Sequence, residues 1–170
     1  MEITRQADYA VRAVLELALR PAGKLVRAEE IARCQAIPPA FLPKILARLV
    51  VAGIVETQRG VKGGVRLTRP AGEVSLLEVV EAVDGPILLN RCLRAPGECP
   101  RDTHCVVHPV WESLREEVRA RLRDETLAVL AKRATTAGPS PTESVSAPHA
   151  APAANAFARD AEGVHPSRRH

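Results

Sequence analysis

The sequence predicts a mainly α-helical fold with one small β-hairpin, organised as a winged helix-turn-helix followed by a long helix. Three amphipathic segments precede a glycine-tipped hairpin within about 75 residues, which is the element order of a winged helix-turn-helix. A later segment repeats apolar residues at helical spacing over several turns. The chain holds only one Trp, one Tyr and two Phe, so its core must be aliphatic.

The first helix is predicted over residues 4–20. Thr4 is a suitable N-cap, and Pro21 and Gly23 end the segment. An apolar stripe recurs at helical spacing through Ala7, Val11, Val14 and Ala18. The charged residues are expected on the outer surface of the helix: Asp8, Arg12, Glu16 and Arg20.

Two further helices are predicted before the hairpin. The second spans residues 28–35, where Cys34 has apolar neighbours at helical spacing and is predicted to be a small buried core residue. The third spans residues 39–52 and ends at Gly53. Its buried stripe is predicted to consist of Leu42, Ile45, Leu46 and Leu49.

The hairpin is predicted from two alternating segments, residues 54–58 and 65–68, joined by RGVKGG. A capping box of Ser75 and Glu78 then opens a helix over residues 76–83. A helix is also predicted over residues 109–123, and Thr126 is predicted to cap a last short turn that runs through Lys132. The Ala-, Pro- and Ser-rich tail, residues 134–170, is predicted to be disordered. We therefore divide the chain into a winged helix-turn-helix (1–75), a loop with a long helix (76–133) and the tail (134–170).

Positive charge concentrates in the first half of the chain. Residues 1–75 carry 12 Lys and Arg against 7 Asp and Glu, whereas the whole chain has a net charge of +4. This asymmetry indicates nucleic-acid binding, although a solvated basic surface gives the same composition. No apolar run is long enough for a membrane span and the N-terminus has no secretory signal, so we expect a cytoplasmic protein without a membrane partner.

Two groups of residues are predicted to contact DNA. The start of the third helix would enter the major groove, and the hairpin tip would reach phosphates or a narrow minor groove. The predicted contacts are Pro39, Ala40, Phe41 and Lys44 in the helix, and Arg59, Gly60 and Lys62 in the wing. Phe41 has two interpretations, a core residue or a contact to a thymine methyl group. A module that binds only protein is the alternative for the whole winged domain.

Three of the four cysteines lie in the stretch RCLRAPGECPRDTHCVVH, with the spacing Cys92-x6-Cys99-x5-Cys105-x2-His108. In a reducing compartment, clustered cysteines are metal ligands or redox groups more often than disulfides. The stretch has no C-x2-C pair, so zinc fits less well than an iron–sulfur cluster, whose ligands must reach around several ångströms. Ordinary thiols with a surface histidine are the remaining interpretation.

Four segments together resemble the Rrf2 family of bacterial regulators, over about residues 1–132. They are ITRQADYAVRAVLELA, the wing VETQRGVKGGVRLTRPA, the helix SLLEVVEAVDG and the loop 92–108 before a long helix. The resemblance implies a homodimeric winged-helix transcription regulator that binds a near-palindromic operator in double-stranded DNA and carries an iron–sulfur cluster as its sensor. It implies the cluster ligands Cys92, Cys99, Cys105 and His108.

The resemblance leaves the fourth ligand and the cluster type open. Some members supply a carboxylate from the partner subunit, and Asp8 stands at the matching place in the first helix. We favour His108, which is three residues from Cys105, and a 2Fe-2S cluster, with a 4Fe-4S cluster as the alternative. The chain departs from IscR-like members in a slightly longer first cysteine interval, and Pro39, Ala40 and Phe41 fill positions that are polar in the family.

The long helix is predicted to pair with its copy in a two-fold dimer through Trp111, Leu114, Val118 and Leu122. We expect a transcription regulator, acting as a repressor, whose operator binding responds to iron–sulfur status, redox stress or nitric oxide. The alternatives are an iron–sulfur or redox carrier, and a winged-helix regulator with zinc or a thiol switch. An enzyme is not expected, because no motif combines a nucleophile, a base and an orienting acid.

Overall fold

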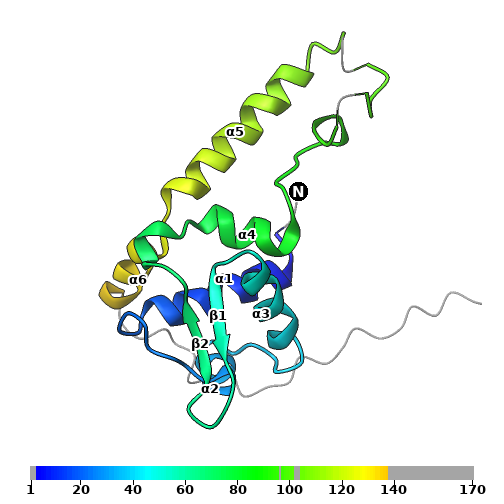
Figure 1. Cartoon of the computed structure of the whole chain (residues 1–170). Coiled ribbons are helices and arrows are strands. Elements are labelled where there is room, and N and C mark those ends of the chain that lie inside the picture. Colours follow the sequence, from blue (N-terminus) through cyan, green and yellow to red (C-terminus); the bar gives the residue numbers. More distant parts are fainter. Residues whose placement is uncertain (1–2, 96, 102–103, 138–170) are drawn as a thin grey trace, which may run out of the picture. The chain divides into compact units, whose positions relative to one another are not determined.

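The computed structural model describes residues 3–95, 97–101 and 104–137, and their fold is mainly helical (Figure 1). The elements in chain order are α1 (Arg5–Ala18), α2 (Ala28–Cys34), α3 (Leu42–Val51), β1 (Val55–Gln58), β2 (Gly64–Leu67), η1 (Ala71–Glu73), α4 (Leu76–Asp84), η2 (Arg91–Leu93), α5 (His108–Asp124) and α6 (Leu127–Thr136). The strands β1 and β2 form an antiparallel hairpin in which Val55 pairs with Leu67. The predicted combination of helices with a small hairpin wing is confirmed.

Helix α1 has the predicted N-cap but a partly different buried face. The Thr4 hydroxyl oxygen accepts a hydrogen bond of 3.2 Å from the Ala7 amide. Val11 and Ala18 are only partly buried, because the buried face follows a spacing of three, four and three residues. That face consists of Ala7, Ala10, Ala13, Val14 and Leu17. Its alanines allow neighbouring helices to approach closely.

Glu16 lies in the interior, contrary to the prediction that it faces solvent. The residue is 5% exposed. Its carboxylate accepts hydrogen bonds from Arg20 Nε at 2.9 Å and from Gln35 Nε2 at 2.7 Å. A buried carboxylate is costly unless it is paired, and these bonds satisfy it. The hydrogen bond to Glu16 also raises the pKa of Arg20. The contacts join α1 to the end of α2.

Two predictions for the helix-turn-helix are wrong. Cys34 is exposed, because each residue turns about 100° around a helix and Cys34 falls away from the face that Ile31 and Ala32 bury. The third helix begins at Leu42 instead of residue 39. In a helix that begins at residue 39, the amide of residue 43 would have to donate a backbone hydrogen bond, and proline has no amide hydrogen. When the helix begins at Leu42, Pro43 falls in the first turn, where the amide hydrogens have no partner within the helix. The predicted buried stripe of this helix is confirmed.

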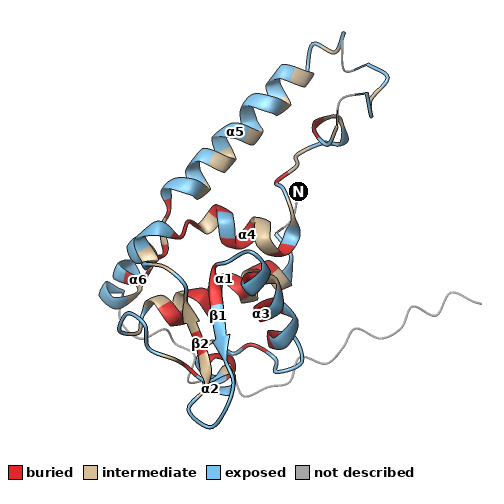
Figure 2. Cartoon of the chain, in the orientation of Figure 1, coloured by how far each residue is buried: buried red, intermediate tan, exposed pale blue. Residues whose placement is uncertain are grey.

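The beginnings of α4 and α6 lie side by side. The predicted capping box opens α4, with the Ser75 hydroxyl accepting from the Glu78 amide at 3.2 Å. Ser75 and Thr126 form an antiparallel backbone bridge, and Thr126 caps α6 as predicted. Helix α6 packs on α1 and η1 through Leu127 and Ala131. It extends to Thr136, beyond the predicted end at residue 132, and the hydroxyl groups of Thr135 and Thr136 donate to carbonyl oxygens of its last turn. Figure 2 shows the buried residues gathered around α1, α4 and the base of the hairpin.

The apolar core continues across residue 75. It includes Val74, Val79 and Leu127 together with the buried residues of α1 to β2. The predicted division into residues 1–75 and 76–133 stays a prediction. Most of the predicted disordered tail, residues 138–170, lies outside the described residues. None of the helices in the described part of the chain combines the length and the low charge that crossing a bilayer requires.

We expect Leu127→Ala to lower the free energy of unfolding by about 2–5 kcal/mol, because a fully buried leucine leaves a cavity when it is truncated. Leu19→Ala is the matched control, since Leu19 is 38% exposed, and it should cost less than about 1 kcal/mol. Urea unfolding followed by circular dichroism measures both. Equal losses at the two positions would contradict the place of α6 in the core.

Candidate functional site

The residues predicted to enter the major groove surround the start of α3. Pro39 and Ala40 lie in the preceding turn, Lys44 lies in the first helical turn, and all three are exposed. Phe41 is 42% exposed, and its ring contacts the Tyr9 ring edge-on with centroids 5.7 Å apart. Phe41 is therefore not a core residue. Packing on Tyr9 holds an exposed aromatic ring beside α3.

The wing tip presents the predicted residues Arg59, Gly60 and Lys62, which are all exposed. Gly60 has a φ of 107°, a conformation that residues with a side chain rarely adopt. A Cβ atom on Gly63 would lie 2.2 Å from the Gln58 carbonyl oxygen, so this turn also requires glycine. These backbone constraints hold two cations at the end of the hairpin.

The wing is also held by the segment before α2, which the sequence pattern did not predict. The backbones of Val26 and Val65 exchange hydrogen bonds of 2.9 and 2.8 Å. Arg27 Nη2 donates to the Val61 carbonyl oxygen at 3.3 Å. A cavity of about 850 Å³ between α2 and the wing is lined in part by Arg27 and Arg33, which are exposed. The two arginines are visible in the sequence, but their nearness to the wing is not, because the partners are far apart in the chain.

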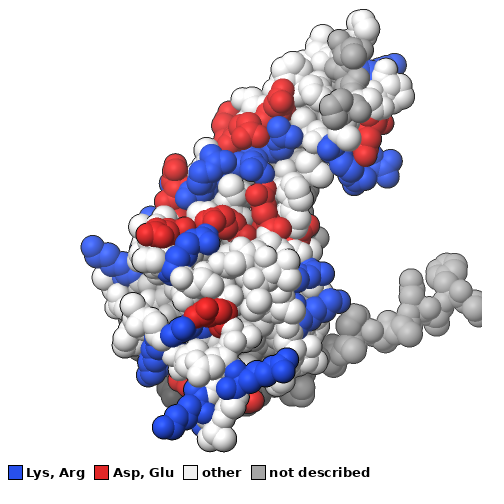
Figure 3. Space-filling view, viewed as in Figure 1, with Lys and Arg blue, Asp and Glu red and all other residues white. Residues whose placement is uncertain are grey.

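Charge is distributed unevenly over the molecule (Figure 3). Basic side chains surround the wing at the bottom of that view, whereas acidic and basic side chains alternate over α4 and α5 higher up. Helix α5 illustrates the alternation, because Arg115 pairs with Glu116 and Arg119 pairs with Glu81. Arg66 of the wing is paired with Glu56, but Arg59 and Lys62 at the wing tip form no ion pair among the described residues, so the tip suits a polyanion.

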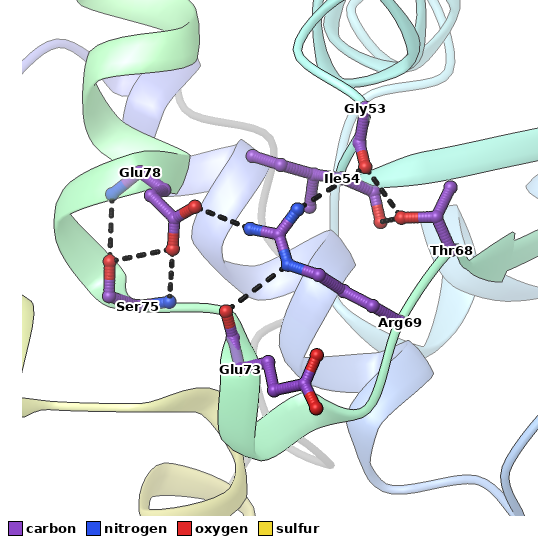
Figure 4. A network of polar contacts seen from close by, with 7 residues as sticks. All are labelled: Gly53, Ile54, Thr68, Arg69, Glu73, Ser75 and Glu78. Carbon is purple, nitrogen blue, oxygen red and sulfur yellow. Dashed lines mark hydrogen bonds and ion pairs between the residues drawn. The ribbon is translucent and has the colours of Figure 1, made fainter.

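A network of polar contacts joins the base of the wing to α4 (Figure 4). Arg69 Nη2 forms an ion pair with Glu78, and Arg69 Nε donates to the Glu73 carbonyl oxygen at 3.1 Å. Glu78 also accepts from the Ser75 amide and hydroxyl, each at 2.9 Å. Partial burial raises the pKa of Glu78, but the hydrogen bonds from Ser75 and the charge of Arg69 outweigh it, so the pKa lies below its ordinary value.

The predicted metal ligands lie between η2 and the start of α5. Cys92, Cys99 and Cys105 are half-buried and free, and His108 is the first residue of α5. Within the described residues, no three His, Cys, Asp or Glu side chains come close enough together to hold a metal ion. The Nδ1 atom of His108 is nevertheless buried and has no hydrogen-bond partner in the part of the chain that the structure describes. An unpaired imidazole nitrogen, three residues after the last of three cysteines in the sequence, fits a metal centre by its donor chemistry.

The alternative ligand Asp8 is in a different condition. Its carboxylate forms an ion pair of 2.8 Å with Arg12, four residues along α1. The Arg12 guanidinium also lies over the Tyr9 ring, 5.8 Å from its centroid. Asp8 therefore already has a partner within its own chain, and His108 Nδ1 has none that the structure describes.

The last turn of α4 connects the cysteine segment to α1 and α3. Glu81 accepts from the Ile87 amide at 3.1 Å and pairs with Arg119 of α5. The Val83 carbonyl oxygen accepts from Arg48 of α3 at 2.5 Å. Asp84 accepts from the Thr4 amide at 3.0 Å. The last turn of α4 thus contacts the segment leading to Cys92, the long helix α5, α3 and the N-cap of α1.

Helix α5 contacts α4 and η2, but its apolar face is not fully covered by the part of the chain that the structure describes. None of its residues, all of which are described, is buried. Leu114 is 39% and Val110 is 52% exposed, and Trp111, Val118 and Leu122 are only half-buried. An apolar face of this kind forms a seam that a second helix covers in two-stranded assemblies.

An exposed recognition-helix start and a basic wing define a winged-helix DNA-binding protein. The model of the Rrf2 family, described as an iron-dependent transcriptional regulator, matches residues 3–133. The chain belongs to this family and is a transcriptional regulator. A HTH-type transcriptional regulator of Mycobacterium tuberculosis is 36% identical over 132 residues, which are 77% of this chain and 81% of the relative.

Two further proteins extend the comparison. IscR of Salmonella agona is 31% identical over 164 residues, which cover 96% of this chain and 98% of IscR. The structure of CymR, the global cysteine regulator of B. subtilis, matches 78% of this chain and 98% of CymR with a TM-score of 0.64. At 22% identity, the second likeness concerns the fold. The relatives are named as transcriptional regulators, in agreement with the prediction that the chain is not an enzyme.

We expect Glu78→Gln to be less stable than the parent protein at neutral pH and nearly equal to it in acid. Because the pKa of Glu78 is lower in the folded protein than in the unfolded chain, its ionised carboxylate stabilises the fold at pH values above the ordinary pKa of a glutamate. This contribution is lost as the pH falls through the folded-state pKa of Glu78. The loss should be below about 1 kcal/mol, because the pair is half exposed. Urea unfolding at neutral and acidic pH measures it. Glu73→Gln is the control, since Glu73 contacts Arg69 through its backbone; the same pH dependence there would contradict the assignment.

Proposed function

We propose that the chain is a homodimeric repressor whose binding to a near-palindromic operator is controlled by an iron–sulfur cluster. The His108 side chain is the observation that carries this proposal. Its Nδ1 is buried, lacks a hydrogen-bond partner among the described residues, and lies three residues after the last of three free cysteines. An unpaired buried nitrogen is costly, and a metal ligand bond would satisfy it.

Under this proposal Cys92, Cys99, Cys105 and His108 hold a 2Fe-2S cluster, with a 4Fe-4S cluster as the alternative. Asp8 of the partner subunit is the weaker candidate for the fourth ligand, because its carboxylate is already paired with Arg12. When bound, the cluster supplies iron that responds to iron–sulfur status, oxidants or nitric oxide. The protein residues contribute the binding site and its connection to α4 through Glu81.

The proposed dimer forms when α5 pairs with α5 of a second copy about a two-fold axis. The exposed face of α5 supports this proposal, because its apolar residues would be covered. The two copies of α3 would then read half-sites on one face of DNA through Phe41 and Lys44. Arg59 and Lys62 of each wing would bind phosphates, and Gly60 would allow close approach.

A thiol switch without a cluster is the second candidate. The free cysteines of the loop and the likeness of the fold to CymR favour it. In this case oxidation of two of the loop thiols would reshape the segment that is attached to α4. The two candidates differ in whether the purified protein contains iron and sulfide.

We expect the protein to bind DNA with a steep salt dependence. A DNA fragment selected from random sequences by the protein itself serves as the ligand, and fluorescence anisotropy measures the affinity over a range of salt concentrations. Arg59→Ala with Lys62→Ala should reduce the slope of log K against log salt by about 2–4 for a dimer, since each lost phosphate contact accounts for about 0.9. Arg123→Ala with Lys132→Ala removes two exposed cations far from the wing in sequence and should leave the slope unchanged. Failure to select any DNA at low salt, with or without a cluster, would contradict the proposal.

We expect protein purified without oxygen to be coloured and to contain iron and sulfide. Cys99→Ala should lose the colour, whereas Cys34→Ala should keep it, because Cys34 lies outside the loop. His108→Ala should change the visible spectrum and make the cluster more labile, and Asp8→Ala should not.

If Asp8→Ala changed the visible spectrum and His108→Ala did not, Asp8 of the partner subunit would be the fourth cluster ligand. A purified protein that is colourless and contains zinc would show that the loop holds a zinc ion instead of a cluster. A metal-free protein whose DNA affinity changes on thiol oxidation would establish the thiol switch.

A further inference from the structure

Arg69 and Glu78 have no part in the proposed contacts with DNA or metal, yet they form the centre of the network at the wing base (Figure 4). Arg69 follows β2, and Glu78 lies in the first turn of α4. We infer that this ion pair is a positioning element: it sets the direction in which the wing points and thereby the DNA affinity, although neither residue touches DNA. The inference rests on the proposed use of the wing to bind DNA.

The Arg69 guanidinium meets each segment that borders the wing. Its Nη1 donates at 3.5 Å to the carbonyl oxygen of Gly53, just before β1. Its Nε donates at 3.1 Å to the carbonyl oxygen of Glu73, after β2. Its Nη2 pairs with Glu78 of α4. A planar group with a fixed fork of donors fixes all three segments at once, which a lysine ammonium cannot do.

Glu78 is itself held in place. Its Oε2 accepts from the Ser75 amide and hydroxyl, both at 2.9 Å, as part of the capping box. The carboxylate therefore cannot follow a moving arginine without breaking the cap of α4. Thr68 reinforces the same place, because its hydroxyl donates to the carbonyl oxygens of Gly53 and Ile54 at 2.5 and 3.1 Å. The ion pair thus joins the wing to a rigid part of the core.

Direct DNA contact by Arg69 fits the structure less well. Its side chain is 30% exposed, and each of its three nitrogen atoms bonds within the protein. The wing tip is seven residues from Arg69 at Lys62, or roughly 20 Å along an extended strand. A rotation of about 10° at the base therefore displaces the tip by ~3.5 Å, which is more than the length of a hydrogen bond to a phosphate. The base of the wing, together with the Val26–Val65 backbone bridge, therefore determines whether its tip reaches DNA.

The test is a double-mutant cycle between Arg69→Met and the wing-tip variant Arg59→Ala with Lys62→Ala. Methionine keeps an apolar stem at the site but removes the donors. We expect Arg69→Met alone to weaken DNA binding on the order of tenfold and to reduce the salt slope, as the wing-tip variant does. In the wing-tip background, the added Arg69→Met should change the affinity by less than about twofold, because the contacts it misplaces are already absent.

Glu78→Gln should weaken DNA binding in the same direction as Arg69→Met. The matched control is Arg133→Met, which breaks an Arg–Glu pair with Glu125 at the junction of α5 and α6. The control should leave the salt slope unchanged. If Arg69→Met does not fold, Arg69→Lys keeps the charge without the fork and should show the same loss of slope.

Two results would overturn the inference while leaving the proposed function intact. The first is parent-like affinity of Arg69→Met. The second is an equal loss of affinity in both backgrounds, which would indicate a general structural effect unrelated to the wing. Failure of the parent protein itself to bind DNA would instead remove the proposed function, and with it the inference.

Discussion

The architecture depends on the close packing of α4 against α1. The buried face of α1 is mostly alanine, and α4 is its most extensive neighbour, so an aliphatic face of α4 fits against it. The buried residues of that face are Leu77, Val79, Val80 and Val83. Because this contact fixes α4, both of its ends become attachment points. The first turn of α4 contacts the wing base and the start of α6. Its last turn contacts α3, the N-cap of α1 and the segment that leads to Cys92.

Features that depend on neighbouring residues could be predicted from the sequence. The caps at Thr4, Ser75 and Thr126 each need only a side chain and an amide a few residues away. The burial of Glu16, in contrast, is decided by a distant partner. Glu16 is buried because Gln35 of the next helix reaches it, and periodicity alone cannot show that. The exposure of Cys34 could not be predicted, because a seven-residue helix is too short for its apolar pattern to define one buried face.

The same distinction holds for the candidate site. The exposed cations of the wing follow from a local glycine-rich turn, and they could be predicted. The contact of Arg27 with the wing could not, since its partner Val61 lies 34 residues further along the chain. For the cysteine loop, spacing and donor chemistry are visible in the sequence. Whether the thiols converge depends on what they bind, because such a loop has few apolar contacts of its own.

The position of Trp111 has a practical consequence. It is the only tryptophan of the chain and lies one turn after His108, half-buried on the apolar face of α5. Indole emission shifts with the polarity of its surroundings and is quenched by nearby metal centres. The native protein therefore contains a single indole fluorophore, and it lies where both the proposed helix pairing and the proposed metal binding would change its surroundings. Events at that end of α5 are accessible to spectroscopy without any added label.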